Sequence, residues 1–355
     1  MSKVPSLTPV CFWKEVYCRA AYLQQNWAKG RYTVVPLLRG HRKRVNCLDC
    51  DGQYVVSGSD DKSARVWNLF TAHCLHVLDV HTDAVTCVVI KNDYVLTGCA
   101  DNHIRIFRVQ TGVFMQTLMG HSASIEHLCF DGHRVLSASA DRTLRVWTLE
   151  LGCCKHVLTG HEDDIQLLTM QDTLAVSTSW DRYIRMWDLE TGNCIKSLSS
   201  QNQVVHCCQF DSRFLIFGGS EGLVVIIETG KEPDDVNGMH RCEGHSSDVY
   251  CLVFNEKIVC SGSADSTIRV WDFTGKCLFT FYEHIGVVRC LHLHGNRLVS
   301  GGDRKKIVVW DVQAGMLLNV VHRNPTLLHK WWVNETRIIT ASPESPGTLT
   351  ILSYW

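Results

Sequence analysis

The sequence predicts an all-β fold, an eight-bladed β-propeller preceded by one short helix. A set of His, Ser, Asp and Trp recurs four times with identical gaps of sixteen, four and six residues. Around each set, apolar and polar residues alternate over short stretches, which is typical of strands. A repeat of roughly 40 residues built from short strands indicates a propeller blade. The complete sets are His41, Ser57, Asp61, Trp67; His121, Ser137, Asp141, Trp147; His161, Ser177, Asp181, Trp187; and His245, Ser261, Asp265, Trp271.

Incomplete copies bring the number of repeats to eight. One copy consists of His81, Thr97, Asp101 and Phe107, and another of His284, Ser300 and Trp310, with Arg304 at the Asp position. Residues 204–227 and 332–352 keep the alternating pattern but lack the set. Each repeat therefore forms one blade, whether or not its four-residue set is complete.

Four strands are expected in each repeat, and the two chain ends should share one blade. In the first repeat the strands are expected at residues 45–50, 54–59, 64–69 and 74–80. Residues 33–38 precede the first repeat and have no strands of their own to pair with, whereas the last repeat stops after its third strand at residues 348–352. We expect the first strand to complete the last blade, which closes the ring and removes an exposed sheet edge.

The region before the propeller has a different pattern. Phe12, Val16, Ala20 and Leu23 recur at helical spacing, and no Gly or Pro interrupts them before Gly30. We therefore divide the chain into a disordered N-terminus at residues 1–10, a helical linker at 11–32 and the propeller at 33–355.

The four-residue sets, called relays below, indicate scaffold rather than catalysis. A Ser-His-Asp trio repeated in several blades has the composition of a hydrolase site, but its repetition indicates that it ties strands together. The sequence has no phosphate-binding Gly loop and no metal-ligand spacing, so we expect no enzyme activity, no cofactor and no metal. Seven of the 18 cysteines fall at two recurring strand positions, as expected of reduced, packed thiols.

The composition limits the expected ligands and the expected cellular location. The 355 residues are 45% hydrophobic and 20% charged, with a net charge of −1. This balance argues against nucleic-acid binding through bulk charge. No signal peptide or membrane-spanning run is evident, so we expect an intracellular protein, cytoplasmic or nuclear.

The repeats resemble the WD-repeat family. The resemblance rests on Gly-His pairs that open repeats and Trp-Asp pairs that close them: Gly40-His41, Gly120-His121, Gly160-His161, Gly244-His245, Trp187-Asp188, Trp271-Asp272 and Trp310-Asp311. The preceding segment, with Trp13-Lys14, Tyr17, Arg19, Asn26-Trp27 and Gly30, resembles the linker of F-box/WD-repeat proteins.

That resemblance implies the substrate-recognition subunit of an SCF-type cullin-RING ubiquitin ligase. An F-box needs a longer helical segment than residues 1–10, where Pro5 and Pro9 disfavour a helix. We therefore expect the F-box to be missing, and a Skp-type adaptor and cullin to bind only a longer form. The alternative is a non-catalytic WD-repeat scaffold for protein assembly without a ligase link.

The resemblance also implies a partner site. In F-box/WD-repeat proteins one propeller face holds a protein substrate, often through a phosphorylated peptide. The corresponding positions and their basic neighbours predict partner-binding residues Arg289, Arg304, Lys305, Lys306, Tyr250, Trp180, Arg44 and Asn46. Arginine suits an acidic or phosphorylated peptide because its guanidinium pairs with carboxylate or phosphate. A solvated basic rim that binds nothing is the alternative for the charged residues.

Overall fold

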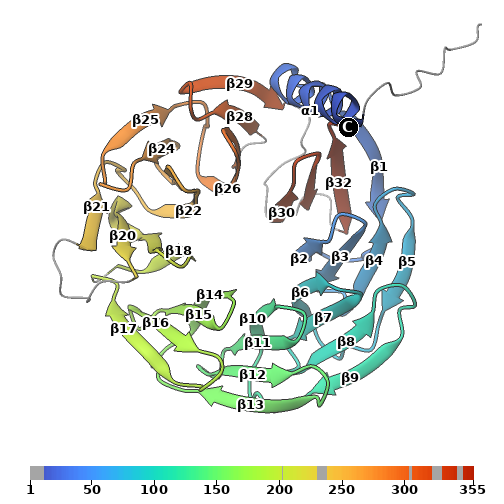
Figure 1. The fold of residues 1–355 in the computed structure, drawn as a ribbon. Coiled ribbons are helices and arrows are strands. Elements are labelled where there is room, and N and C mark those ends of the chain that lie inside the picture. The colour runs from blue at the N-terminus through green and yellow to red at the C-terminus, as the bar shows by residue number, and fades with distance from the viewer. Residues whose placement is uncertain (1–11, 202, 230–237, 304–305, 322–329, 342–346) are drawn as a thin grey trace, which may run out of the picture.

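The chain forms a ring of eight four-stranded sheets arranged around a common centre (Figure 1). The structure is a computed structural model that describes residues 12–201, 203–229, 238–303, 306–321, 330–341 and 347–355. The N-terminal residues 1–10, expected to be disordered, lie outside the described residues. The predicted eight-bladed propeller is confirmed.

Blades 1 to 4 follow one another in chain order, each with its first strand innermost. Blade 1 consists of β2 (Val45–Cys50), β3 (Tyr54–Ser59), β4 (Ala64–Asn68) and β5 (Cys74–Leu78). Blade 2 consists of β6 (Val85–Lys91), β7 (Tyr94–Cys99), β8 (Ile104–Arg108) and β9 (Phe114–Leu118). Blade 3 consists of β10 (Ile125–Phe130), β11 (Arg134–Ser139), β12 (Leu144–Thr148) and β13 (Cys153–Leu158). Blade 4 consists of β14 (Ile165–Gln171), β15 (Leu174–Ser179), β16 (Tyr183–Asp188) and β17 (Cys194–Ser199).

Blades 5 to 8 complete the ring. Blade 5 consists of β18 (Val205–Phe210), β19 (Phe214–Gly219), β20 (Val224–Glu228) and β21 (Met239–Cys242), with a short 3-10 turn, η1 (Ser220–Gly222). Blade 6 consists of β22 (Val249–Phe254), β23 (Val259–Ser263), β24 (Ile268–Trp271) and β25 (Cys277–Phe281). Blade 7 consists of β26 (Val288–His294), β27 (Arg297–Gly302), β28 (Ile307–Asp311) and β29 (Met316–Val321). Blade 8 consists of β30 (Lys330–Val333), β31 (Arg337–Ala341), β32 (Thr348–Ser353) and, from the start of the chain, β1 (Thr33–Arg39).

The ring closes through β1, as the sequence predicts. β1 pairs antiparallel with β32, with Thr33 opposite Ser353 and Arg39 opposite Thr348. The register shifts between Val35 and Leu38, around Pro36, and Pro is tolerated on such an outer strand. β1 is thus the outermost strand of blade 8, and the first and last strands of the chain are paired in one sheet.

The hydrophobic core lies between neighbouring blades. One cluster joins Val56 and Val66 of blade 1 to Val85, Val95 and Phe107 of blade 2. The side chains of Val56, Val66, Val85 and Val95 are fully buried. Sheets stacked in this way bury apolar residues on both faces, so the second strand of each blade has a nearly continuous run of buried residues.

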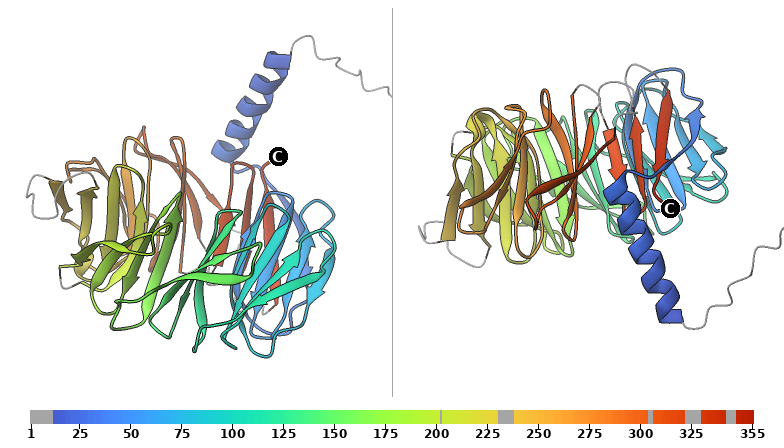
Figure 2. Two further views of the ribbon diagram at one scale, coloured as in Figure 1. Left: turned by 60° about the horizontal axis from the view of Figure 1, so that its bottom comes forward. Right: turned by 90° about the horizontal axis from the view of Figure 1, so that it is seen from above.

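The helix α1 (Phe12–Lys29) packs against blades 7 and 8 and projects away from the ring (Figure 2). It ends at Gly30, whose φ of 63° is the left-handed conformation that glycine adopts easily. The Arg31 amide donates to the Asn26 carbonyl at 2.8 Å and the Gly30 amide to the Trp27 carbonyl at 3.4 Å. These two bonds form the Schellman motif that ends many helices.

Candidate functional site

In each of four blades the relay connects the entry loop, which carries the histidine, to the second and third strands and the turn between them. The histidine Nδ1 lies 2.7 to 2.9 Å from the aspartate carboxylate, and Nε2 lies 2.8 to 2.9 Å from the serine hydroxyl. The tryptophan Nε1–H donates to the same hydroxyl at 2.8 to 2.9 Å. A carboxylate can only accept, so Nδ1–H of the histidine donates to the aspartate. In the neutral ring Nε2 then accepts from the serine hydroxyl, and that hydroxyl accepts from the indole.

Burial keeps these histidines neutral. In blade 1, burial lowers the pKa of His41 below 6.5, although the Asp61 carboxylate acts in the opposite direction. Burial alone would raise the pKa of Asp61, but hydrogen bonds from Ser63, the Arg42 amide and His41 lower it to about 2. The serine hydroxyl is fully buried, and the same trio occurs in several blades, so the relay has the properties of scaffold.

Two blades have incomplete relays. In blade 2 His81 contacts Thr97 at 2.8 Å, but the carboxylate of Asp101 pairs with Arg105 at 2.8 Å instead. In blade 7 His284 contacts Ser300 at 2.8 Å. The Nδ1 atoms of both histidines have no hydrogen-bond partner within the described part of the chain. Burial lowers the pKa of each histidine to about 4.

The predicted partner residues that the structure describes lie on one face of the ring. The start of each first strand pairs with the end of the second, as Val45 does with Ser59, so these ends share one edge of each sheet. We call this edge, with the loops that lead into the blades, the loop face. The opposite edge, which includes Arg297, Glu335 and α1, is called the helix face. α1 therefore leaves the loop face uncovered.

Three side chains form a stack across blades 5, 6 and 7 on the loop face. His206, Tyr250 and Arg289 are each the second residue of an innermost strand. The rings of His206 and Tyr250 are 4.9 Å apart with an interplanar angle of 23°, and the Arg289 guanidinium carbon lies 5.0 Å from the Tyr250 ring centre. We call these three residues the loop-face stack.

Carboxylates accompany this stack. Arg289 Nε and Nη2 lie 3.3 and 3.5 Å from the two carboxylate oxygens of Asp303. His206 Nε2 lies 3.5 Å from Asp248. The charge of Arg289 is thus partly offset within the protein, and an acidic ligand must compete with Asp303 for the guanidinium.

The other predicted residues do not form one cluster. Lys306 is paired with Glu283 at 2.9 Å, and Asn46 donates to Asp60 at 2.6 Å. Trp180, 45% exposed, and the exposed Arg44 belong to blades 4 and 1. Arg304 and Lys305 lie outside the described residues. The structure therefore brings together Tyr250 and Arg289. Lys306 belongs to blade 7 like Arg289 but is paired with Glu283, and Trp180 on blade 4 and Arg44 and Asn46 on blade 1 lie apart from the stack.

Sequence reasoning did not select His206, Asp248 or Asp303 for the site. Asp303 follows Arg289 by fourteen residues, the same spacing that separates Asn46 from Asp60, and both pairs are in contact. That recurring spacing was the available signal. The stacking also had a signal, because His206, Tyr250 and Arg289 take the same position in the innermost strands of three consecutive blades.

Within the described ranges, no three His, Cys, Asp or Glu side chains are placed to hold a metal ion. No described helix has the length and apolar content needed to cross a membrane.

Comparison with known proteins establishes the family. The family described as "WD domain, G-beta repeat" matches residues 32–68, 72–108, 112–148, 152–188, 237–272 and 275–311, more than half of the chain. The repeats and their relays define a WD-repeat β-propeller, a fold that typically serves as a non-catalytic scaffold. The chain belongs to the WD domain, G-beta repeat family.

Individual relatives match over parts of the ring. The "F-box/WD repeat-containing protein sel-10" of Caenorhabditis elegans is 36% identical over 92 residues, 24% of this chain and 16% of that protein. The "Guanine nucleotide-binding protein subunit beta" of Oryza sativa subsp. indica is 27% identical over 139 residues, 36% of this chain and 37% of that protein. The chain thus spans well under half the length of these relatives.

A solved structure has the same fold over most of the chain. The crystal structure of the computationally designed Ika8 protein superimposes with a TM-score of 0.80 and 26% sequence identity. It covers 89% of this chain and 98% of the designed one.

Proposed function

We propose that this propeller is the substrate-recognition subunit of an SCF-type cullin-RING ubiquitin ligase. In this proposal the loop face binds a segment of the target protein, and the helix face is oriented toward the ligase. The observation that carries the proposal is the position of α1, which packs on the side of the ring opposite the loop-face stack. A connector on one face leaves the other face open to a target.

The way α1 is anchored supports this division. The Trp27 indole donates to the Glu335 carbonyl at 2.7 Å and stacks on Tyr354 with ring centres 3.6 Å apart. The guanidinium of Arg297 lies 4.2 Å from the centre of the Trp27 ring. Such a buried anchor fixes the direction in which the helix leaves the propeller. The similarity to a protein named for an F-box and WD repeats is a second, independent support.

The target segment would bind at the loop-face stack. Tyr250 offers an aromatic surface and Arg289 offers paired donors, and aromatic and Arg residues are enriched where binding energy is concentrated. An acidic or phosphorylated group in the target would displace Asp303 from Arg289. The proposed site residues are Tyr250 and Arg289, with Lys306 of blade 7, Trp180 of blade 4, and Arg44 and Asn46 of blade 1 as further contacts on the loop face.

A scaffold without a ligase link is the second candidate. The similarity to a G-protein β subunit covers a larger share of this chain than the similarity to sel-10, and it requires no ubiquitin chemistry. Both candidates use the loop face to bind proteins. They differ in what happens to the bound protein.

Protein turnover separates the two candidates. The tagged full chain and a Tyr250→Ala/Arg289→Glu variant would each be used to capture proteins from cells. For every protein that the wild type captures and the variant does not, the half-life would be measured with and without cullin-RING inhibition. The ligase proposal expects those half-lives to lengthen on inhibition. Unchanged half-lives for every such protein would favour the scaffold. Ser246→Ala, an exposed change on the same face, serves as the control for capture.

A further inference from the structure

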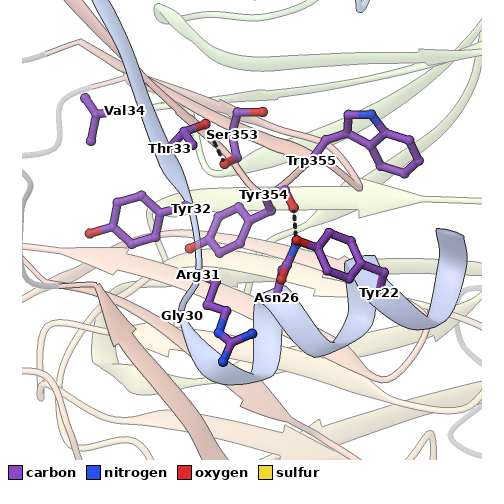
Figure 3. Close-up of a pocket in the computed structure, with 10 residues that line it drawn as sticks. All are labelled: Tyr22, Asn26, Gly30, Arg31, Tyr32, Thr33, Val34, Ser353, Tyr354 and Trp355. Carbon is purple, nitrogen blue, oxygen red and sulfur yellow. Dashed lines mark hydrogen bonds between the residues drawn. The ribbon is translucent and has the colours of Figure 1, made fainter. Parts of the chain in front are cut away.

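A hollow of about 510 Å³ lies on the helix face, where the innermost strands of blades 4, 5 and 6 end. Pockets that hold ligands in proteins measure about 300–1,000 Å³. α1 packs on the same face over blades 7 and 8 instead (Figure 1), where Asn26 Nδ2 donates to the Tyr354 carbonyl at 2.9 Å (Figure 3). The hollow is thus separate from both α1 and the loop-face stack, and we call it the blade 4–6 hollow.

The apolar wall of the hollow consists of one side chain from each of three innermost strands. Met170, Phe210 and Phe254 are each the sixth residue of their strand, and all three are half-buried. The corresponding residues of blades 1 to 3 are each 6% exposed: Cys50, Ile90 and Phe130. Blades 4 to 6 therefore leave partly open to solvent a set of apolar side chains that the other three blades bury. Apolar side chains gathered at one place on a surface are typical of binding sites.

Aromatic packing holds one part of this wall in place. The Phe273 ring contacts the Phe254 ring edge to face, with centres 6.5 Å apart and an interplanar angle of 87°. Phe273 also stacks on Phe214, with ring centres 4.3 Å apart. A wall that is fixed before a ligand arrives avoids the cost of ordering its side chains on binding.

The charged residues of the hollow are acidic. Among the described residues that line it, only Asp211 and Glu256 are charged. Asp211 Oδ1 accepts the backbone amides of Arg213 and Phe214, each at 2.7 Å, but neither carboxylate is ion-paired with a described cation. Arg213 and Lys257 follow the two acids in the sequence but do not line the hollow. Two carboxylates without a cation beside an apolar wall favour an apolar side chain with a basic neighbour.

We propose that the blade 4–6 hollow binds a segment of a partner protein in which a bulky apolar side chain is flanked by lysine or arginine. The apolar side chain packs against Phe210, Phe254 and the adaptable, polarisable side chain of Met170. The flanking cations pair with Glu256 and Asp211. The hollow is a second protein-binding site on the face opposite the loop-face stack, and it does not depend on the ligase proposal.

The binding can be followed at Met170 in the full chain. Acetyl-Lys-Phe-Lys-amide would be titrated into protein labelled with ¹³C at the methyl groups of its seven methionines, and Met170→Leu would assign the Met170 signal. We expect a saturable NMR shift of the Met170 methyl group. The methyl groups of Met115 and Met316, which are exposed on the outermost strands of blades 2 and 7, should not shift.

Control peptides separate the apolar contribution from the charged one. Acetyl-Glu-Phe-Glu-amide keeps the aromatic ring but reverses the charge, and acetyl-Lys-Ala-Lys-amide keeps the charge but lacks the ring. Each should bind at least about tenfold more weakly than acetyl-Lys-Phe-Lys-amide, because each lacks one of the two complementary groups.

A charge reversal in the protein locates the binding. Glu256→Lys should weaken binding of the lysine peptide about tenfold and strengthen binding of acetyl-Glu-Phe-Glu-amide. Glu150→Lys is the matched control, since Glu150 is also an exposed carboxylate on the helix face, in the turn after β12, but it does not line the hollow. It should leave the binding of both peptides unchanged.

Four outcomes would overturn the proposal: no saturable shift at Met170, equal binding of the acidic peptide, equal binding of the alanine peptide, or no effect of Glu256→Lys. A Met170 shift that depends on protein concentration without peptide would identify a second copy of this chain as the occupant, which also contradicts it. The Tyr250→Ala/Arg289→Glu variant should bind the lysine peptide like the wild type, so this result is distinct from that of the loop-face experiment.

Discussion

Blades 1, 3, 4 and 6 complete their relays, whereas blades 2 and 7 hold a buried histidine that lacks its carboxylate. Each complete relay satisfies both ring nitrogens of its histidine and the tryptophan N–H. In blades 2 and 7 only Nε2 is satisfied. The comparison shows that the fold does not need every relay, because inter-blade apolar packing continues through the blades without one.

The difference also indicates where the ring can vary. The loop-face stack runs through blades 5 and 7, which lack a complete relay, and through blade 6, which has one. In blade 7 Asp303 stands one position before the relay aspartate position and contacts Arg289. The turn that lost its relay carboxylate thus supplies a carboxylate to the neighbouring surface. In blade 1 both positions of the turn carry a carboxylate, since Asp60 contacts Asn46 while Asp61 completes the relay, so the surface carboxylate does not require loss of the relay.

The largest expected effect concerns blade 8, which lacks a relay in its sequence and is closed by β1 instead. A chain that begins at Gly40 loses β1, including Leu38, which is 1% exposed. We expect it to lose more than about 4 kcal/mol of unfolding free energy or to aggregate through the exposed β32 edge. Thermal and urea unfolding would measure this.

A chain that begins at Thr33 is the matched control, because it loses α1 but keeps β1. It should be less destabilised than the chain that begins at Gly40. Equal unfolding midpoints for the two truncations would contradict the role of β1 in closure.

The second effect compares a complete relay with an incomplete one. Ser261→Ala in blade 6 removes the partner of both His245 and Trp271, two buried groups that each cost about 1–3 kcal/mol when unpaired. Thr97→Val in blade 2 leaves only His81 Nε2 without a partner, since Phe107 has no polar group. We therefore expect a larger loss in unfolding free energy for Ser261→Ala, by urea titration.

Ser246→Ala controls for the loss of a hydroxyl in the same blade, because Ser246 is exposed and contributes only its backbone amide to Asp265. It should unfold like the wild type. If Thr97→Val proved as costly as Ser261→Ala, the two kinds of relay would not differ in stability.

The third effect is pH dependence in the incomplete relays. His81 and His284 have folded-state pKa values of about 4, below the ordinary value of 6.5, so the unfolded chain binds protons that the folded chain excludes. Stability is therefore unaffected above pH 6.5 and falls as the pH drops from 6.5 toward 4, by about 3 kcal/mol per histidine.

A His284→Leu variant should show a shallower loss of urea midpoint between pH 7 and pH 5 than the wild type. Its stability at pH 7 will be lower, because the variant also loses the bond to Ser300. The change of the urea midpoint with pH, rather than its value at pH 7, therefore tests the prediction. A slope equal to that of the wild type would indicate that the His284 proton equilibrium does not contribute.

The sequence predicted the repeating part of this molecule closely. The first-blade strands expected at 64–69 and 74–80 end at Asn68 and Leu78, and the helix expected within 11–30 spans Phe12–Lys29. Recurrence made this possible, since four copies of one pattern reinforce each other. The contact of α1 with the end of the chain was not predicted, because Asn26 and Tyr354 are separated by almost the whole chain and meet only after the ring closes.

The loop face was predicted only in part, because contacts between its side chains form only in the folded ring. Family positions identified Tyr250 and Arg289, but they did not indicate that Asp303 already occupies the guanidinium. Pairing of that kind depends on side-chain directions within a turn. The sequence repeat gives the position of a residue within its blade, whereas the charged side chain that lies beside it depends on the conformation of the local turn.

The smallest expected effect on stability compares two tryptophans of blade 4. Trp187 is 2% exposed and donates to Ser177 at 2.8 Å, whereas Trp180 is 45% exposed on the loop face. Trp187→Phe should lose about 1–3 kcal/mol because Ser177 loses a buried partner. Trp180→Phe should change the unfolding free energy by less than about 0.5 kcal/mol, as exposed substitutions usually do. Thermal unfolding of the two variants tests this, and a comparable loss for Trp180→Phe would show that this residue belongs to the scaffold rather than to the partner-binding surface.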